Sequence, residues 1–227
     1  MRLFVTATVA LSASGLSAQQ PTRYTAVAPV VFVAERFVAA DLGPSRSILL
    51  SDGSCCAMDR GVLVGGEGVF RFGWASLRVG AVFGTLENVV LGRTENVLIA
   101  TLSGRYHPTT WFAVGPEIDY WRSTAGVSQT RPFGRVSVRG RGGLGVTFNA
   151  PLGVPSIRGL LDLAFYVLDA ENRDDRWNHR VRVLLEYATS GTPLWVRVGY
   201  REELFFSGDD VDELRGVLVS IGLRFGR

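Results

Sequence analysis

The 227-residue sequence has no lysine and few of the residue types that most metal and catalytic sites use. All 24 basic residues are arginines, and there are only two histidines and two cysteines. The arginines are spread along the chain without forming a basic block, which argues against a nucleic acid as a partner despite the formal net charge of +3. After residue 18, no apolar run approaches the ~20 residues that a membrane-spanning helix needs.

The two cysteines are adjacent, and this limits what they can do. An exported chain meets oxidising conditions, so a disulfide between Cys55 and Cys56 is allowed, although neighbouring cysteines can close only a strained ring. Two ligands are too few for a structural zinc site. We therefore expect no metal and no cofactor. A disulfide between the two cysteines is one possible state, and unpaired cysteines are the other.

The first 18 residues have the pattern of a secretory signal peptide. A positive start at Met1–Arg2 precedes an apolar stretch from Leu3 to Leu16, and Ala18 ends a plausible cleavage site. We expect residues 1–18 to be removed and residues 19–227 to form one exported domain.

Beyond residue 60 the sequence alternates between apolar and polar residues with a period of two, which predicts β-strands. In 178–188, for example, Val181, Val183 and Leu185 alternate with arginines at 180 and 182. Nine strands are predicted: 61–72, 74–83, 97–106, 111–121, 133–148, 156–168, 178–188, 193–203 and 214–225.

The strands place charged residues on the face opposite the apolar one. This set comprises Glu67, Arg71, Arg78, Arg105, Glu117, Asp119, Arg135, Arg139, Arg141, Arg158, Asp162, Arg180, Arg182, Glu186, Arg197, Arg201 and Arg224. A soluble β protein would bury the apolar face, whereas a membrane barrel turns it toward lipid and the charges inward.

Three features favour the membrane barrel: the signal peptide, short connections that alternate with longer ones (84–96, 122–132, 169–177 and 204–213), and aromatic residues near the strand ends. One predicted girdle comprises Phe72, Trp74, Tyr106, Trp111, Phe148, Tyr187, Trp195 and Phe225. A second, at the opposite ends, comprises Tyr120, Trp121, Tyr166, Trp177, Tyr200, Phe205 and Phe206.

Bacterial membrane barrels have an even number of strands, so nine strands imply a tenth, which we place in 24–37. The predicted fold is an all-β, antiparallel, up-and-down transmembrane β-barrel of ten strands, with eight as the alternative. The last strand carries Val217, Val219, Ile221, Leu223 and Phe225 in alternation, followed by Gly226 and Arg227. In this architecture and in this terminal pattern the chain resembles small bacterial outer-membrane β-barrel proteins of the OmpA-like kind.

The resemblance implies a location in the bacterial outer membrane, contact with its lipid, and recognition of strand 214–225 by the barrel-assembly machinery. An extracellular ligand is not specified. The inward set contains twelve arginines and five acids, an excess of +7. Either arginine–carboxylate pairs fill the lumen, which we favour because small barrels are just wide enough for side chains to fill, or the lumen is a narrow pore that favours anions.

No convincing catalytic motif is present, so we expect a structural or surface-binding protein and not an enzyme. Residues 140–145 match G-x-G-x-x-G, but they lie inside a predicted strand, where the glycines are expected to let the wall bend. A lipid-modifying enzyme or protease using His179 is the remaining alternative, since His107 lies in a short turn. The acidic groups Asp209, Asp210, Asp212, Glu213 and Asp169, Glu171, Asp174, Asp175 are expected to be solvated outer loops.

Overall fold

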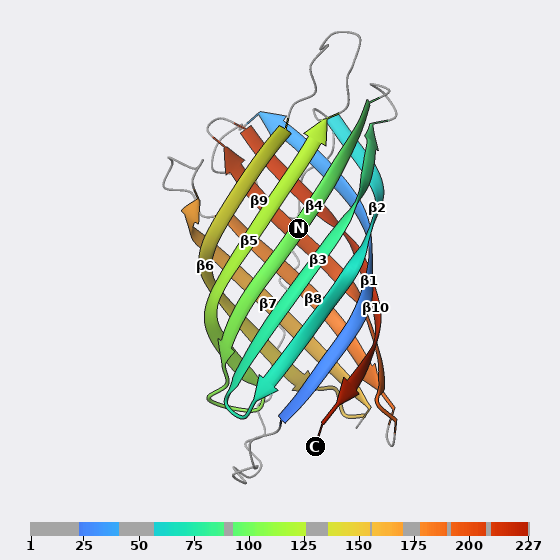
Figure 1. Cartoon of the computed structure of the whole chain (residues 1–227), viewed down its shortest axis with the longest axis vertical. Helices are drawn as coiled ribbons and strands as arrows, with labels where there is room; N and C mark the ends of the chain where they lie inside the picture. Colours follow the sequence, from blue (N-terminus) through green and yellow to red (C-terminus); the bar gives the residue numbers. More distant parts are fainter. Residues whose placement is uncertain are drawn as a thin grey trace, which may run out of the picture.

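The computed structural model describes residues 23–40, 57–88, 93–125, 136–154, 156–169, 178–189, 192–207 and 210–226. These residues form ten strongly tilted antiparallel strands that close into one barrel (Figure 1). The strands are β1 Arg23–Ala40, β2 Ala57–Phe72, β3 Ala75–Asn88, β4 Arg93–Tyr106, β5 Phe112–Ala125, β6 Val136–Pro151, β7 Ile157–Asp169, β8 Asn178–Ala188, β9 Leu194–Ser207 and β10 Asp210–Phe225.

Each strand pairs with its neighbours in sequence, and β1 closes the barrel against β10. Val31 of β1, for instance, lies opposite Val219 of β10 on one side and Val64 of β2 on the other. The predicted ten-stranded, up-and-down barrel is therefore confirmed. Within the part of the chain that the structure describes, no helix is long and apolar enough to cross a membrane.

The connections differ from the prediction at two places. Only residues 89–92 separate β3 from β4, and only residues 208–209 separate β9 from β10, so the predicted long connections 84–96 and 204–213 are wrong. The acidic residues at 210, 212 and 213 accordingly belong to β10 and not to a loop. The error arose because strand ends were placed where apolar alternation stops, whereas backbone pairing continues beyond that point.

Side-chain exposure alternates along the strands in the inside-out sense. In β8, Val183 and Leu185 are 52% and 50% exposed on the outer wall, whereas Arg180 is 0% exposed. The apolar residues thus face outward and the arginines inward, as in a barrel that is surrounded by lipid.

The tenth strand, β1, alternates poorly because both of its faces are apolar. Val31 and Val33 face outward, while Val30, Phe32 and Ala34 are buried inside the barrel. These three side chains join an apolar cluster that also contains Leu63, Val82, Leu86, Val97, Ile99, Trp121, Leu160, Leu184, Leu214 and Leu218. The lumen therefore has an apolar sector, formed mainly by β1–β4 and β10, which the prediction of a charged interior missed.

Candidate functional site

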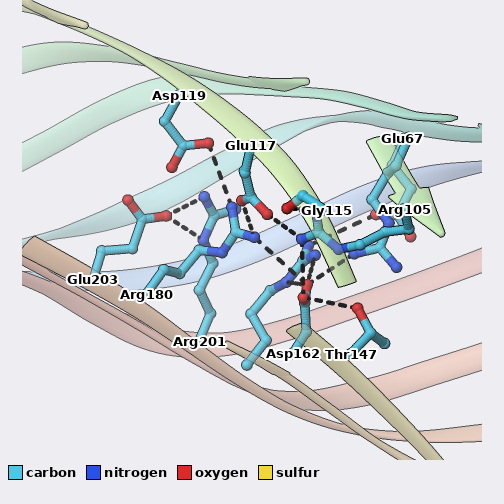
Figure 2. A network of polar contacts seen from close by, with 12 residues as sticks. Glu67, Arg105, Gly115, Glu117, Asp119, Thr147, Asp162, Arg180, Arg201 and Glu203 are labelled. Carbon is cyan, nitrogen blue, oxygen red and sulfur yellow. Dashed lines mark hydrogen bonds and ion pairs between the residues drawn. The ribbon is translucent and has the colours of Figure 1, made fainter. Parts of the chain in front are cut away.

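Inward-facing side chains of β2–β9 bring most of the predicted lumen charges into one buried group, which we call the central network (Figure 2). It consists of Glu67, Arg78, Arg105, Glu117, Asp119, Arg141, Asp162, Arg180, Arg182, Glu186, Arg197, Arg201 and Glu203. The strands supply these residues at every second position, so the period of the strand directs all of them to the axis.

Several ion pairs of the central network join strands that are not neighbours in the sheet. Arg180 of β8 pairs with Glu117 of β5. An Arg141 nitrogen of β6 lies 2.9 Å from Oε2 of Glu203 in β9, and an Arg197 nitrogen of β9 lies 2.6 Å from Oε1 of Glu67 in β2. Such pairs cross the lumen and tie opposite walls together.

Asp162 of β7 is the most shared carboxylate of the central network. Its oxygens lie 2.8 Å from an Arg78 nitrogen and 3.5 Å from nitrogens of both Arg105 and Arg180, and it also pairs with Arg182. The Thr147 hydroxyl donates a hydrogen bond of 3.1 Å to Oδ1 of Asp162. Since the carboxylate is 2% exposed, these guanidinium groups take the place of water around it.

Gly145 of β6 leaves room for one of these pairs. A Cβ atom at this position would lie 2.0 Å from the Arg105 guanidinium and 2.6 Å from the Glu117 carboxylate. Arg105 fills this space, pairs with Glu117 and donates to the carbonyl oxygen of Pro116 at 3.1 Å. Within 140–145, Gly145 therefore makes room for an ion pair in the interior, which the expectation of simple bending did not include.

Among the residues whose side chains the structure describes, the sequence prediction missed four charged residues of the lumen: Arg36, Asp59, Glu95 and Glu203. Arg36 of β1 pairs across the barrel with Glu95 of β4, and all four lie on the inward face of their strands. Strand parity could have found Glu203, which lies two residues after Arg201. The one arginine and three acids lower the predicted positive excess by two charges.

The remaining predicted lumen residues lie toward the ends of the barrel. Arg71, Arg158 and Arg224 are near the end with the short turns, which we call the turn end, and Arg158 is exposed there. Arg224 donates to Glu186 at 3.0 Å. Arg139 is partly buried near the opposite end. Arg135, together with Cys55 and Cys56, falls outside the described residues.

Most members of the predicted aromatic girdle at the turn end have exposed side chains. Phe72, Trp74, Tyr106, Trp111, Tyr187 and Phe225 are all exposed in the strands and turns at this end, and Phe148 packs against Trp111. At the opposite end, Tyr120 and Tyr200 face outward, whereas the side chains of Trp177, Phe205 and Phe206 are outside the described residues.

Three aromatic residues assigned to the girdles instead face the lumen. Trp195, Trp121 and Tyr166 are 2%, 4% and 2% exposed. Trp195 lies 4.2 Å below the Arg197 guanidinium, and Tyr166 lies 4.0 Å from that of Arg141. The assignment is wrong because it used only distance from the strand end, although all three share the parity of the inward charges.

This difference predicts how the tryptophans respond to lipid. In single-tryptophan variants reconstituted with brominated lipid, we expect strong fluorescence quenching of Trp74 and Trp111, because their side chains are exposed at the turn end. Trp195 should be quenched much less, because its ring packs inside the barrel against Arg197. Quenching of Trp195 as strong as that of Trp74 would contradict the inward orientation.

Charged residues also occur on the outer wall, at the end away from the turns. Glu35 lies 3.0 Å from Arg60 and 3.9 Å from Arg215, and Arg215 lies 3.3 Å from Glu213. Strands of 11 to 18 residues are mostly longer than the ~9–11 needed to cross a membrane. The wall thus continues past its apolar band, and this polar patch marks where the band ends.

His107 follows β4 in a turn, where its Nε2 lies 2.8 Å from Oγ of Ser76. Partial burial, followed by the positive charges of Arg71, Arg78 and Arg105, lowers the pKa of His107 from 6.5 to about 4. A neutral imidazole at ordinary pH provides no cation and no strong proton acceptor at this position.

We expect an NMR titration of the refolded barrel to show a His107 pKa of about 4, with the resonance assigned by a His107→Gln variant. The folded state disfavours the imidazolium, so this group destabilises the fold progressively as the pH falls from 6.5 toward 4, with no further loss below that value. A measured pKa near 6.5 would show that the arginines do not act on this ring.

His179, the other histidine, faces outward from β8, opposite Leu204. His179 has an odd residue number in β8, whereas the inward residues of this strand have even numbers, so its side chain points away from the inward acids. Among the residues that the structure describes, no three His, Cys, Asp or Glu side chains are grouped as metal ligands would be. The arrangement that the geometry does offer is therefore the central network.

A small cavity lies where the central network meets the apolar sector. Its volume is about 30 Å³. Glu67, Arg78, Arg182 and Arg201 line its polar side, and the apolar side includes Val30, Val82, Ile99 and Leu218. By the same measure a water molecule needs roughly 10–15 Å³, so the cavity has room for one or two small species and not for an organic ligand.

Comparison with known proteins finds similarity in structure alone. No family model matches the chain, and no curated protein matches its sequence. Ail, the attachment invasion locus protein of Yersinia pestis, is 9% identical over 90% of this chain and 99% of that chain, with a TM-score of 0.37. The P. putida toluene transporter TodX (10% identity, 93% and 92% coverage, TM-score 0.41) and Neisserial surface protein A (13%, 90% and 97%, 0.38) are similar as well.

At these identities the similarity concerns only the fold. The closed sheet, the apolar outer wall and the inward charges are features of this chain itself. The chain is thus an antiparallel ten-stranded β-barrel with an apolar outer wall and inward-facing charges.

Proposed function

We propose that this protein is a non-conducting and non-catalytic barrel of the bacterial outer membrane, with a structural or surface-binding role. The observation that carries the proposal is the set of ion pairs that cross the lumen. Arg180, Glu117 and Glu203 are each at most 1% exposed, and this burial supports a lumen that is closed at the level of these pairs. Side chains fill the interior of small barrels, and here they also connect opposite walls.

The lumen pairs support a rigid wall better than a channel. Conduction needs sites that an ion can enter and leave easily. In this barrel the guanidinium groups are already held by carboxylates, and several of those carboxylates contact more than one arginine. A braced barrel of this kind suits a protein that presents its outer end to a partner.

Planar-bilayer recording tests the closed lumen. We expect purified, refolded protein to give no conductance steps above background, whereas a porin inserted into the same bilayer gives clear steps. Reproducible steps with a reversal potential that favours anions would reject the closed barrel and support the alternative of a small anion pore. That alternative is motivated by Arg71, Arg158 and Arg224 at the turn end.

Location is part of the same proposal: export through residues 1–18 and assembly through the terminal strand with Phe225 exposed at its end. We expect the protein in the outer-membrane fraction, lacking its first 18 residues and migrating faster on gels when unheated than when boiled. Recovery of the chain from the periplasmic fraction in soluble form would contradict the proposal.

A further inference from the structure

The cavity beside the central network has an unusual lining. Three arginines, Arg78 of β3, Arg182 of β8 and Arg201 of β9, border it together with one acid, Glu67. The side chains of Arg182 and Arg201 are both 6% exposed. The side chains of Arg78 and Glu67 are 17% and 13% exposed, so the space lies in a largely but not fully buried part of the lumen.

The carboxylates near the cavity are shared among several arginines. Arg78 and Arg182 both pair with Asp162, which also lies 3.5 Å from Arg105 and from Arg180. Glu67 contacts Arg197 at 2.6 Å and Arg182 at 3.8 Å. Asp162 and Glu67 therefore each contact more than one arginine.

The charges of the central network nearly cancel over its described members. It contains seven arginines and six carboxylates. Arg224, which also pairs with Glu186, has a side chain that is 27% exposed and reaches solvent. The lining of the cavity differs, because three arginines and one acid, Glu67, border it, and a bound anion offsets this local excess of positive charge.

We propose that the cavity binds one monovalent anion of halide size, held by Arg78, Arg182 and Arg201. The volume of about 30 Å³ admits a chloride or bromide ion but not a phosphate ester or an organic acid. The apolar side of the cavity, with Val82, Ile99 and Leu218, favours an anion that gives up its hydration easily. The bound anion offsets the positive charge of the cavity lining and is a structural component of the barrel.

Unfolding by urea in chloride and in gluconate tests the proposal, with gluconate serving as an anion too large for the cavity. At constant ionic strength, we expect the unfolding midpoint to rise with chloride concentration and then to saturate. Chloride at ten times its Kd should raise the ratio of folded to unfolded protein about tenfold. Equal midpoints in the two salts would overturn the proposal.

Two variants separate binding in the cavity from general salt effects. Gly80→Ala places a methyl group in the cavity, with its nearest contact an ordinary 3.5 Å from Cβ of Glu67, and should abolish the difference between the salts. Gly68→Ala adds the same group on the outer wall, 3.5 Å from the Phe70 ring, and should keep the difference. A chloride effect that persists unchanged in Gly80→Ala would overturn the proposal.

Arg201→Met removes one positive charge and leaves Glu203 paired with Arg141, so this variant should fold without a chloride requirement. Crystals grown in bromide should show an anomalous peak in the cavity of the wild type and none in Gly80→Ala. A bromide peak in both proteins, or in neither, would also reject the site. These readouts do not depend on whether the barrel conducts, so they test the anion site separately from the closed lumen.

Discussion

Replacing Asp162 by asparagine should destabilise the folded barrel by about 3–5 kcal/mol, the cost typical of removing one partner from a buried ion pair. The shape of the side chain is nearly unchanged, so the effect measures the loss of charge. Four arginines, at 78, 105, 180 and 182, would lose the carboxylate that they share. Urea unfolding in lipid vesicles, followed by tryptophan fluorescence, gives the free energy of unfolding.

Glu87→Gln is the matched control for this experiment. Glu87 lies on the outer wall of β3 and is exposed, so the same exchange of carboxylate for amide should change the free energy of unfolding by less than about 0.5 kcal/mol. If Asp162→Asn had an equally small effect, the central network would not be a major source of stability, and the argument for a braced lumen would lose its basis.

Gly145→Ala should destabilise the barrel by about 2 kcal/mol, the scale of a lost hydrogen bond to a charged group in a buried position. The added methyl group would occupy the space of the Arg105 guanidinium and force it away from Glu117. The displaced guanidinium has little free space to enter, because it also contacts the carbonyl oxygens of Gly104, Gly115 and Pro116.

The same substitution at Gly140 provides a sharp comparison, because this glycine lies five residues away in the same strand. A Cβ at position 140 would meet no atom within 4 Å, and the position faces outward. We expect Gly140→Ala to leave stability unchanged or slightly improved, since alanine restricts the unfolded chain. Equal losses at both positions would mean that β6 needs glycine for its backbone and not for the ion pair inside.

The sequence predicted the wall of the barrel better than its interior, and the reason is the range of the interactions. Alternation with a period of two is a local property, so Val183 and Arg182 could be assigned to opposite faces without knowledge of the fold. Strand ends were less predictable. Pairing between β9 and β10 continues to Ser207 and Asp210, where neither face shows apolar alternation.

The aromatic residues show that the alternation of side chains along a strand also predicts which tryptophans face the lumen. Trp195 and Trp121 were placed in the girdles by their distance from strand ends, although parity alone directs them inward. Inside the barrel they serve as surfaces for guanidinium groups, with Arg197 over Trp195 and Arg36 over Trp121. Parity was thus the stronger of the two sequence signals.

The sequence by itself determined the direction in which each side chain points, because the geometry of a strand imposes that alternation wherever the strand lies. Only the tertiary structure decided which charges meet. Arg197 and Glu67 are 130 residues apart, and they face each other because closure of β1 against β10 sets how strands on opposite walls are aligned. The sharing of Asp162 among four arginines and the cavity beside it follow from that alignment, which no local pattern records.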